Sequence, residues 1–234
     1  MNANKPLGIK SYGSIPHLPG SRMGPGDHHC HEGQARICTT EVRDRHDKVI
    51  VQEKLDGSCV AVAKIAGEIV PLGRAGYLAS SSPYPHIQHF AAWALMNRDR
   101  FDKLLAEGER VVGEWMGMAV GTKYKLVHEP FAAFDIIKDH ERLCCYEFME
   151  RVNRFGFVFP IIIAAGPTTI DLAMNRVILS GHGALEPVEG CVWRVERKGR
   201  VDFLCKYVRP DKIDGKYLPK DGEEGIYYWR PDAK

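Results

Sequence analysis

The sequence predicts an α+β fold, built from antiparallel strand pairs with helices inserted at irregular intervals. Turn sequences join neighbouring apolar runs at residues 66–68 and 197–200, which is typical of hairpins between antiparallel strands. Apolar residues follow helical spacing between residues 83 and 105, but no helical segment separates the strands that flank these turns. A doubly wound parallel sheet, which needs a long crossover between successive strands, is therefore disfavoured.

The individual elements follow from local patterns. The first 48 residues are rich in Gly, Pro, His and Arg and are expected to form loops with short strands. Farther along, apolar runs predict strands and helical spacing predicts helices, with Thr168 as the N-cap of the last helix. The expected strands cover residues 49–55, 58–65, 69–74, 110–116, 131–138, 157–163, 190–196 and 201–208. The expected helices cover residues 83–105, 143–155 and 168–179.

Composition narrows the class of protein. The 234 residues suffice for one sizeable domain, and a net charge of +2 restricts any nucleic-acid surface to a local patch. No stretch approaches the ~18 apolar residues of a membrane span, and the N-terminus lacks the apolar core of a signal peptide. Seven cysteines, mostly in apolar segments, are typical of buried thiols in a reducing compartment. We therefore expect a cytoplasmic protein with no membrane partner.

Lys54 is the most informative residue, because it ends an apolar run and precedes Asp56 and Gly57. A lysine acts as a nucleophile only if its pKa falls from ~10.4 toward neutrality, as neighbouring cations or a metal would cause. Gly57 suggests a sharp turn that brings backbone amides near a phosphate, and the glycines around Arg74 allow close approach of a ligand. The alternative is a surface lysine paired with Glu53 or Asp56.

Three acids and one further lysine lie inside otherwise apolar segments: Glu114, Asp135, Glu189 and Lys206. A buried carboxylate is costly unless it meets a cation, a metal ion or a hydrogen-bond donor. The acids therefore indicate either a shared ligand or separate structural ion pairs. If Lys206 lies near Lys54, each ammonium lowers the pKa of the other, which would activate Lys54.

Taken in order, these segments resemble the motifs of the covalent lysyl-nucleotidyltransferase superfamily of ATP-dependent ligases and capping enzymes. Their spacing, together with residues 11–22, resembles the ATP-dependent RNA ligases of phage and RNA-editing type. The likeness covers roughly residues 10–210 and implies an adenylation domain of antiparallel sheets with flanking helices, the nucleotide pocket lying between the sheets. The matching segments are EKLDGS at 53–58, GRAG at 73–76, GE at 113–114, FDI at 134–136, EG at 189–190 and CK at 205–206.

The resemblance implies a reaction in three steps. Lys54 would attack the α-phosphate of ATP, release pyrophosphate and hold AMP as a lysyl-AMP intermediate. AMP would pass to a 5′-phosphate end, and a 3′-hydroxyl would displace it to join the strands, as in RNA repair. Lys206 would neutralise charge on the phosphate in the transition state. The expected partner is nucleic acid, with RNA ends or nicks as substrates.

The resemblance also implies where the cofactors bind. Glu53 would read the adenine amino group, Phe134 would stack on the base, and Arg74 and Glu114 would hold the ribose. Carboxylates would carry Mg²⁺ or Mn²⁺ through its water molecules or orient the lysine. The residues expected to bind the nucleotide are Glu53, Asp56, Gly57, Arg74, Glu114, Phe134 and Glu189. The expected metal ligands are Glu189 and Asp135.

Two features depart from the family pattern. The last motif often has two lysines one residue apart, whereas Leu204 occupies the first of these positions here and Arg209 is a candidate substitute. Residues 1–210 are expected to form the adenylyltransferase domain and residues 211–234 a short polar tail, below the ~50 residues of a small domain. Related enzymes usually continue into a second domain, so a partner protein could replace it.

Several alternatives remain open on the sequence alone. A DNA nick ligase or a GTP-using capping enzyme would share the lysine chemistry, and a non-catalytic module that binds nucleic-acid ends would share the fold. The His- and Cys-rich residues 27–38 fit no common zinc-ligand spacing and are better explained as a polar loop over the pocket. Arg194, Arg197, Lys198 and Arg200 predict a basic hairpin, either binding phosphates or simply solvated.

Overall fold

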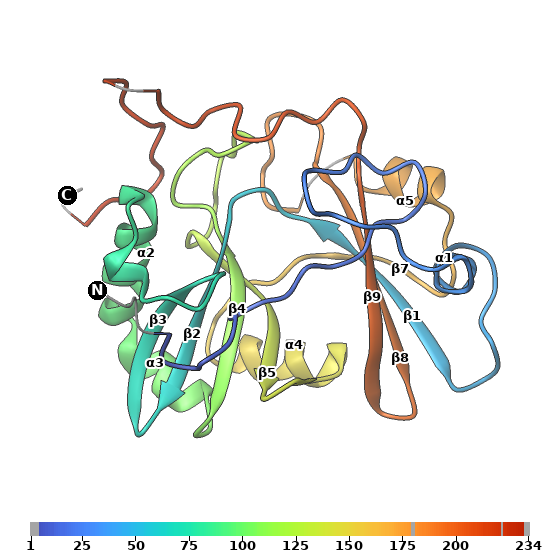
Figure 1. The fold of residues 1–234 in the computed structure, drawn as a ribbon, viewed down its shortest axis with the longest axis horizontal. Helices are drawn as coiled ribbons and strands as arrows, with labels where there is room; N and C mark the ends of the chain where they lie inside the picture. The colour runs from blue at the N-terminus through green and yellow to red at the C-terminus, as the bar shows by residue number, and fades with distance from the viewer. Residues whose placement is uncertain (1–4, 179–180, 221, 232–234) are drawn as a thin grey trace.

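The computed structural model describes residues 5–178, 181–220 and 222–231. In this part of the chain two antiparallel sheets lie side by side, with helices on their outer sides (Figure 1). One sheet contains β2 (Ser58–Ile65), β3 (Glu68–Gly73), β4 (Glu109–Trp115), β5 (Phe131–Lys138) and β6 (Glu141–Arg142). The other contains β1 (Asp47–Lys54), β7 (Ile162–Ala165), β8 (Gly190–Arg197) and β9 (Arg200–Val208). The helices are α1 (Glu32–Thr39), α2 (Pro85–Met96), α3 (Arg98–Leu104), α4 (Cys145–Arg154), α5 (Ile170–Arg176) and the 3₁₀ turn Ala79–Ser81.

The strand orders confirm the predicted α+β class with antiparallel sheets. They are β3-β2-β4-β5-β6 in the first sheet and β7-β1-β8-β9 in the second. The first sheet is built from one continuous stretch of chain, with helices inserted between β3 and β4. The second combines β1 with strands from the last third of the described residues. Lys54, at the end of β1, is thereby carried to the junction of the two sheets (Figure 1).

An aromatic core holds the five-stranded sheet against α2 and α3. Phe90 and Trp93 of α2 pack 5.5 Å and 5.6 Å, ring to ring, from Trp115 of β4 and Phe131 of β5, respectively. Phe101 of α3 lies edge-on to Phe131. Because side chains alternate along a strand, the neighbouring residues of β4 and β5 point away from this core. The aromatic packing thus holds β4 and β5 in place, and the other face of the sheet forms part of the pocket wall.

The four-stranded sheet is also two-faced. Val49 and Val51 of β1 and Trp193 of β8 belong to a buried cluster beneath α1 and α5. Alternation places Gln52 and Lys54 on the other face of β1, which is turned toward the five-stranded sheet. Pairing of β1 with β8 along its whole length, from Asp47 to Lys54, fixes this register.

A buried ion pair joins the two sheets. The Arg194 guanidinium of β8 lies 2.6 Å from the Asp135 carboxylate of β5, and both side chains are almost fully buried. Arg142 and the hydroxyl of Tyr12 bind the other oxygen of the same carboxylate at 3.0 Å and 2.9 Å. A carboxylate with this many partners compensates for its burial. Arg194 lies on the predicted β8–β9 hairpin, but its side chain is buried, so the alternative that it is simply solvated is wrong.

The N-terminal segment extends the four-stranded sheet. The backbone amide of Lys206 in β9 donates to Pro16, and the amide of Leu18 donates back to Lys206. Farther on, the amide of Arg22 donates to Val208. Residues 16–22 therefore lie along β9 and close the pocket on that side.

Some elements differ from the sequence-based expectation. Helix α1 was missed because its short sequence, EGQARICT, contains few strongly apolar residues. The expected helix over residues 83–105 is interrupted at Asn97, where α2 ends and α3 begins. The N-cap of α5 is Thr169, whose hydroxyl accepts from Leu172, whereas Thr168 donates to the carbonyl of Gly166. The expected strand at 157–163 starts later, at β7. Helix α5 ends at Arg176, earlier than the expected end at residue 179, which lies outside the described residues.

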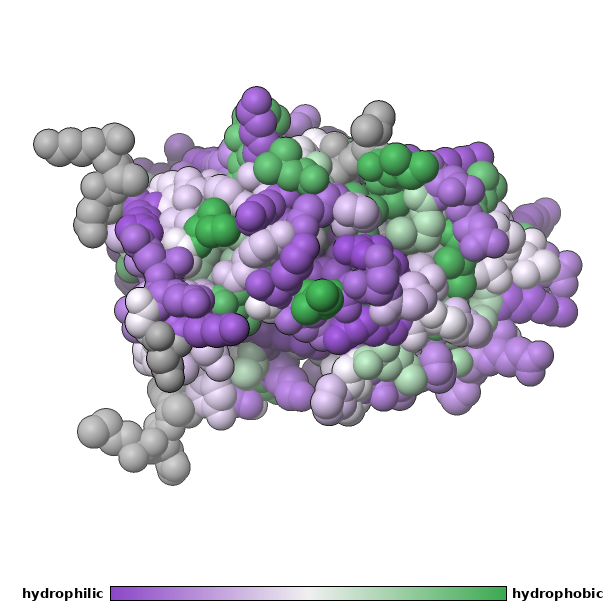
Figure 2. Space-filling view, turned by 90° about the horizontal axis from the view of Figure 1, so that it is seen from above, coloured by the Kyte–Doolittle hydropathy of each residue, from purple (hydrophilic) through white to green (hydrophobic). Residues whose placement is uncertain are grey.

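The chain after residue 210 packs back onto the domain. The amide of Tyr217 donates to Val120, the amide of Ala119 donates to Ile226, and Trp229 lies edge-on to Trp115. Figure 1 shows this segment, in red, running across the top of the molecule toward α2. The surface seen from above is mostly hydrophilic, with hydrophobic residues in separate clusters (Figure 2). No helix among the described residues is long and apolar enough to cross a membrane.

Candidate active site

A pocket of about 480 Å³ lies between the two sheets. Its walls come from the end of β1 and the following loop, from β8 and β9, and from residues on β4, β5 and the N-terminal segment. This volume is in the range of pockets that hold small organic ligands. Apart from Asp135, the candidate residues chosen from sequence all border the pocket: Glu53, Lys54, Asp56, Gly57, Arg74, Glu114, Phe134, Glu189 and Lys206.

Lys54 forms an ion pair inside this pocket. Its ammonium lies 2.6 Å from the Glu189 carboxylate, and its side chain is about one-fifth exposed. Burial alone would lower the pKa of Lys54, but the carboxylates of Glu189 and Glu114 outweigh it and hold the pKa above its ordinary value. The two ammonium groups lie close enough to lower each other's pKa, as expected, but the expected net lowering of the Lys54 pKa is not found. In this arrangement the lysine is positioned but still protonated.

Glu114 holds the loop that follows Lys54. Its carboxylate accepts a hydrogen bond from the backbone amide of Gly57 at 3.0 Å. Burial raises the pKa of Glu114 to about 7, an effect that the Lys54 ammonium opposes and the Glu189 carboxylate increases. A Cβ at position 57 would lie 2.4 Å from the carbonyl oxygen of Trp115, so glycine is required by close backbone approach. The amide of Gly57 is thus bonded to Glu114 in this structure.

Asp56 borders the pocket and is held in place by residues from other segments of the chain. Its carboxylate accepts from the Thr122 hydroxyl at 2.7 Å and pairs with the ammonium of Lys212. Its backbone amide donates to the hydroxyl of Tyr124 at 3.0 Å. These partners come from the segment after β4 and from the chain after β9, so two distant segments immobilise the loop next to Lys54.

Lys206 lies on β9 with its ammonium toward the pocket. Burial lowers the pKa of this ammonium, and the positive charge of Lys54 lowers it further. Asp27 from the N-terminal segment is its nearest counter-ion, at 3.6 Å, and also pairs with His17 at 3.1 Å. Leu204, two residues before Lys206, borders the pocket on the same face of β9. This position therefore adds apolar surface where related sequences often add a second charge.

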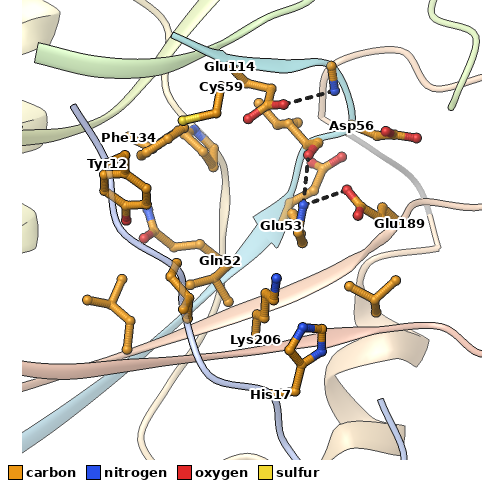
Figure 3. Close-up of a pocket in the computed structure, with 18 of the residues that line it drawn as sticks. Tyr12, His17, Gln52, Glu53, Asp56, Cys59, Glu114, Phe134, Glu189 and Lys206 are labelled. Atoms are coloured by element: carbon orange, nitrogen blue, oxygen red, sulfur yellow. Dashed lines mark hydrogen bonds and ion pairs between the residues drawn. The ribbon is translucent and has the colours of Figure 1, made fainter. Parts of the chain in front are cut away.

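The opposite end of the pocket is aromatic. Phe134 is half-buried and meets the ring of Tyr12 edge-on at 5.1 Å. Figure 3 places Phe134, Tyr12 and Gln52 together on one side, away from Asp56 and Glu189. Arg74 is exposed at the rim, with its guanidinium 3.4 Å from the Ser14 hydroxyl. The pocket thus has an apolar end and a charged end, as a nucleotide requires.

Two predicted site residues are placed differently from expectation. Asp135 does not border the pocket, because its carboxylate is bonded to Arg194, Arg142 and Tyr12. Its predicted role as a metal ligand is therefore replaced by a structural one. Glu53 borders the pocket, yet it pairs across the sheet with Cys191 on the covered face, and its carboxylate accepts from the amide of Gly181 at 3.2 Å.

Sequence reasoning missed several residues that border or support the pocket. Gln52 precedes Lys54 by two positions in an apolar strand, a signal that alternation could have exposed. His17 was considered only as part of residues 11–22, which carried the family resemblance, and Asp27 only as part of the polar loop or zinc alternative at residues 27–38. Lys212 lies in the segment expected to be a polar tail, where nothing local distinguishes it from a surface lysine.

The charged end fits a metal ion carried by a ligand better than a resident one. Among the residues that the structure describes, no three His, Cys, Asp or Glu side chains are grouped to hold a metal ion by themselves. The zinc alternative for residues 27–38 therefore finds no support in the described residues. Glu189 and Glu114 nevertheless concentrate negative charge beside Lys54, and burial raises the pKa of both. Mg²⁺ commonly binds through one or two carboxylates together with substrate phosphates.

Comparisons with known proteins agree with this architecture. A family model of RNA ligases matches residues 47–208, more than half of the chain. A point mutant of the Naegleria gruberi RNA ligase with ATP and Mn superposes with a TM-score of 0.55 at 19% identity, covering 86% of this chain and 61% of that one. A second such mutant gives a TM-score of 0.54 at 20% identity, covering 86% and 60%. An archaeal ATP-dependent RNA ligase gives 0.48 at 19% identity, covering 70% and 43%. No curated protein matches the chain.

The two-sheet fold is that of the nucleotidyltransferase domain of ligases. The chain belongs to the RNA ligase family, as its sequence motifs indicated. It spans between 43% and 61% of the length of the solved structures named above.

Proposed function

We propose that this protein is an ATP-dependent RNA ligase that forms a covalent lysyl-AMP intermediate on Lys54. The position of the Lys54 ammonium supports this proposal most strongly. It lies at the charged end of a nucleotide-sized pocket, 2.6 Å from Glu189 and within the electrostatic influence of Lys206. A lysine that served only to form a stabilising ion pair would not need to border a cavity of this size.

The first step would be transfer of AMP to Lys54. The nitrogen attacks the α-phosphorus of ATP, a nitrogen–phosphorus bond forms, and the bond to the β-phosphate oxygen breaks to release pyrophosphate. Glu189 orients the nitrogen and gives its proton an acceptor. Lys206 faces the same space and would stabilise negative charge that develops on the phosphate. Mg²⁺ or Mn²⁺, held at Glu189 and by the phosphates, would neutralise triphosphate charge.

Base and sugar would occupy the aromatic end. Phe134 would stack on adenine, and Glu114 and Arg74 would border the ribose. The later steps, transfer of AMP to a 5′-phosphate and sealing by a 3′-hydroxyl, rest on membership of the RNA ligase family. The preference for RNA ends or nicks over DNA is part of the proposal on the same ground. The seven cysteines are all free, which suits work in a reducing compartment such as the cytoplasm.

The test is covalent labelling. The protein is incubated with Mg²⁺ or Mn²⁺ and either ATP or GTP carrying a labelled α-phosphate, then denatured and examined for bound label. We expect label from ATP, its loss in Lys54→Ala, and its retention in Lys48→Ala, which changes an exposed lysine of the same strand. No label from either nucleotide would refute the enzyme, and label from GTP alone would indicate a capping enzyme.

A second assay tests which nucleic acid the protein seals. Single-stranded and nicked duplex substrates of RNA or DNA, each with a 5′-phosphate, are offered to the labelled protein. Sealing of RNA in preference to DNA is expected. Sealing of DNA nicks alone would favour a DNA ligase, and adduct without any sealing would limit the claim to adenylation.

A further inference from the structure

Gln52 is a buried polar residue whose amide nitrogen lacks a hydrogen-bond partner among the described residues. It is 5% exposed, and the nitrogen itself is shielded from solvent. Burying an amide without a partner costs free energy, so native proteins rarely tolerate it without a reason. Gln52 lies two residues before Lys54 on β1 and shares its pocket-facing side.

The surroundings of Gln52 are apolar or already bonded. Its amide points toward Tyr12, beside Phe134, at the end of the pocket away from Glu189 (Figure 3). The hydroxyl of Tyr12 already donates to Asp135. Val192 faces Gln52 across the β1–β8 pair and completes this part of the wall. The amide nitrogen of Gln52 therefore remains without a hydrogen-bond partner among the described residues at this end of the pocket.

Glu53 is poorly placed for the same task. It borders the pocket, but it pairs across the strands with Cys191, whose side chain lies in the cluster behind the sheet, so alternation turns the Glu53 side chain toward that side. Its carboxylate accepts from the amide of Gly181. The family resemblance assigns base recognition to Glu53. Gln52, the residue before it, is better placed for this role.

We propose that Gln52 determines the base specificity of the site by pairing its amide with the amino group and adjacent ring nitrogen of adenine. This inference rests on the proposed function, since it assumes that a nucleotide occupies the pocket. A glutamine amide has one donor group and one acceptor, which match the donor and acceptor edges of adenine in a bidentate pair.

Guanine would fit this end less well. Its C6 carries a carbonyl in place of the amino group of adenine, and its own amino group, at C2, needs an acceptor elsewhere; an amino group buried without one is costly. The two carboxylates nearest in sequence to the aromatic end, Glu53 and Asp135, are bonded elsewhere. Phe134, Val192 and Leu204, which also line the pocket, offer no side-chain acceptor.

The experiment compares adduct formation from ATP and GTP in the wild type, Gln52→Leu and a control. The control is Gln88→Leu, which alters an exposed glutamine of α2 that donates to Ser82. In the wild type ATP should react faster than GTP. Gln52→Leu should reduce that ratio by about tenfold or more, the discrimination of one bidentate pair, while Gln88→Leu leaves it unchanged. An equal loss for both nucleotides in Gln52→Leu would overturn the inference.

Two further measurements separate this inference from the proposed function. Equilibrium binding of ATP and GTP is measured in the Lys54→Ala background, where no adduct can form. If the wild type yields no adduct but Gln52→Leu abolishes an ATP preference in binding, the ligase proposal fails and the role of Gln52 stands. The midpoint of thermal unfolding without nucleotide should be equal or higher in Gln52→Leu, because an unpaired buried amide has been removed. A large decrease would indicate a structural role and contradict the inference.

Discussion

The ammonium of Lys212 lies 2.5 Å from the carboxylate of Asp56. Lys212 is 3% exposed and comes from the chain after β9, whereas Asp56 lies two residues after Lys54. A Cβ at position 121 would lie 2.0 Å from the same ammonium, so Gly121 makes room for it. The pair ties the C-terminal segment to the loop that carries the proposed nucleophile.

Replacement of Lys212 should therefore be destabilising. Lys212→Met leaves the Asp56 carboxylate buried with only the Thr122 hydroxyl, and loss of one partner of a buried pair costs about 3 kcal/mol. Urea unfolding should show this decrease in the free energy of unfolding. Lys216→Met, which breaks an exposed pair with Glu186, should cost far less, because solvent screens such a pair. Equal effects of the two changes would contradict the importance of the Lys212 pair.

Asp135 and Glu189 should respond differently to substitution. Asp135→Asn weakens the junction with Arg194 and should lower stability by about 3 kcal/mol, without raising the Mg²⁺ concentration needed for half-maximal adenylation. Glu189→Gln should raise that concentration by about tenfold. The measurement is a Mg²⁺ titration of adduct formation alongside thermal unfolding. A metal requirement changed by Asp135→Asn alone would restore the role that its motif suggested.

Buried histidine should make stability depend on pH. Burial lowers the pKa of His86 to about 4, with the charge of His89 adding to the effect, whereas an unfolded histidine titrates near ~6.5. Between these values the unfolded chain binds the extra proton, so the free energy of unfolding falls as pH drops from ~6.5 toward 4. His86 contributes at most about 1.4 kcal/mol per pH unit to this slope. Unfolding curves of His86→Gln should show a flatter dependence, and those of His140→Gln, an exposed histidine, should match the wild type.

Introducing a second lysine into the last motif should increase neither stability nor adduct formation. Leu204 is 7% exposed and pairs across the β8–β9 hairpin with Arg194, so Leu204→Lys places a cation beside a buried cation. We expect a loss of about 3 kcal/mol in stability and no gain in adduct formation. Leu204→Met, which keeps the volume, should cost less than about 1.5 kcal/mol. Faster adenylation by Leu204→Lys would contradict this prediction and show that a positive charge at position 204 favours the reaction.

Local patterns were sufficient for most strands and for the residues of the charged end. The strands that carry Lys54, Glu114 and Lys206 are predicted by apolar runs that contain charged residues. What the sequence could not provide was the partner of each charge. Asp135 and Arg194 each appear as charges in apolar strands, but their mutual pairing depends on how two separate sheets meet.

The remaining differences have the same physical origin. Glu53 and Gln52 are adjacent and both border the pocket, and the register of β1 decides which of the two side chains lies on the same face as Lys54. That choice is fixed by the pairing of β1 with β8, more than a hundred residues away. Lys212 gains its role only because the segment after β9 folds back across the molecule.

The two sheets also differ in how soon they can form during protein synthesis. Strands β2 to β6 occupy residues 58–142 and can pair with one another as soon as they leave the ribosome. Strand β1 must wait for β8, because Lys54 pairs with Gly190 and long-range strand pairing is slow. The strand that carries Lys54 is thus synthesised early, but the pocket around Lys54 can be completed only after β8 and β9 have been synthesised.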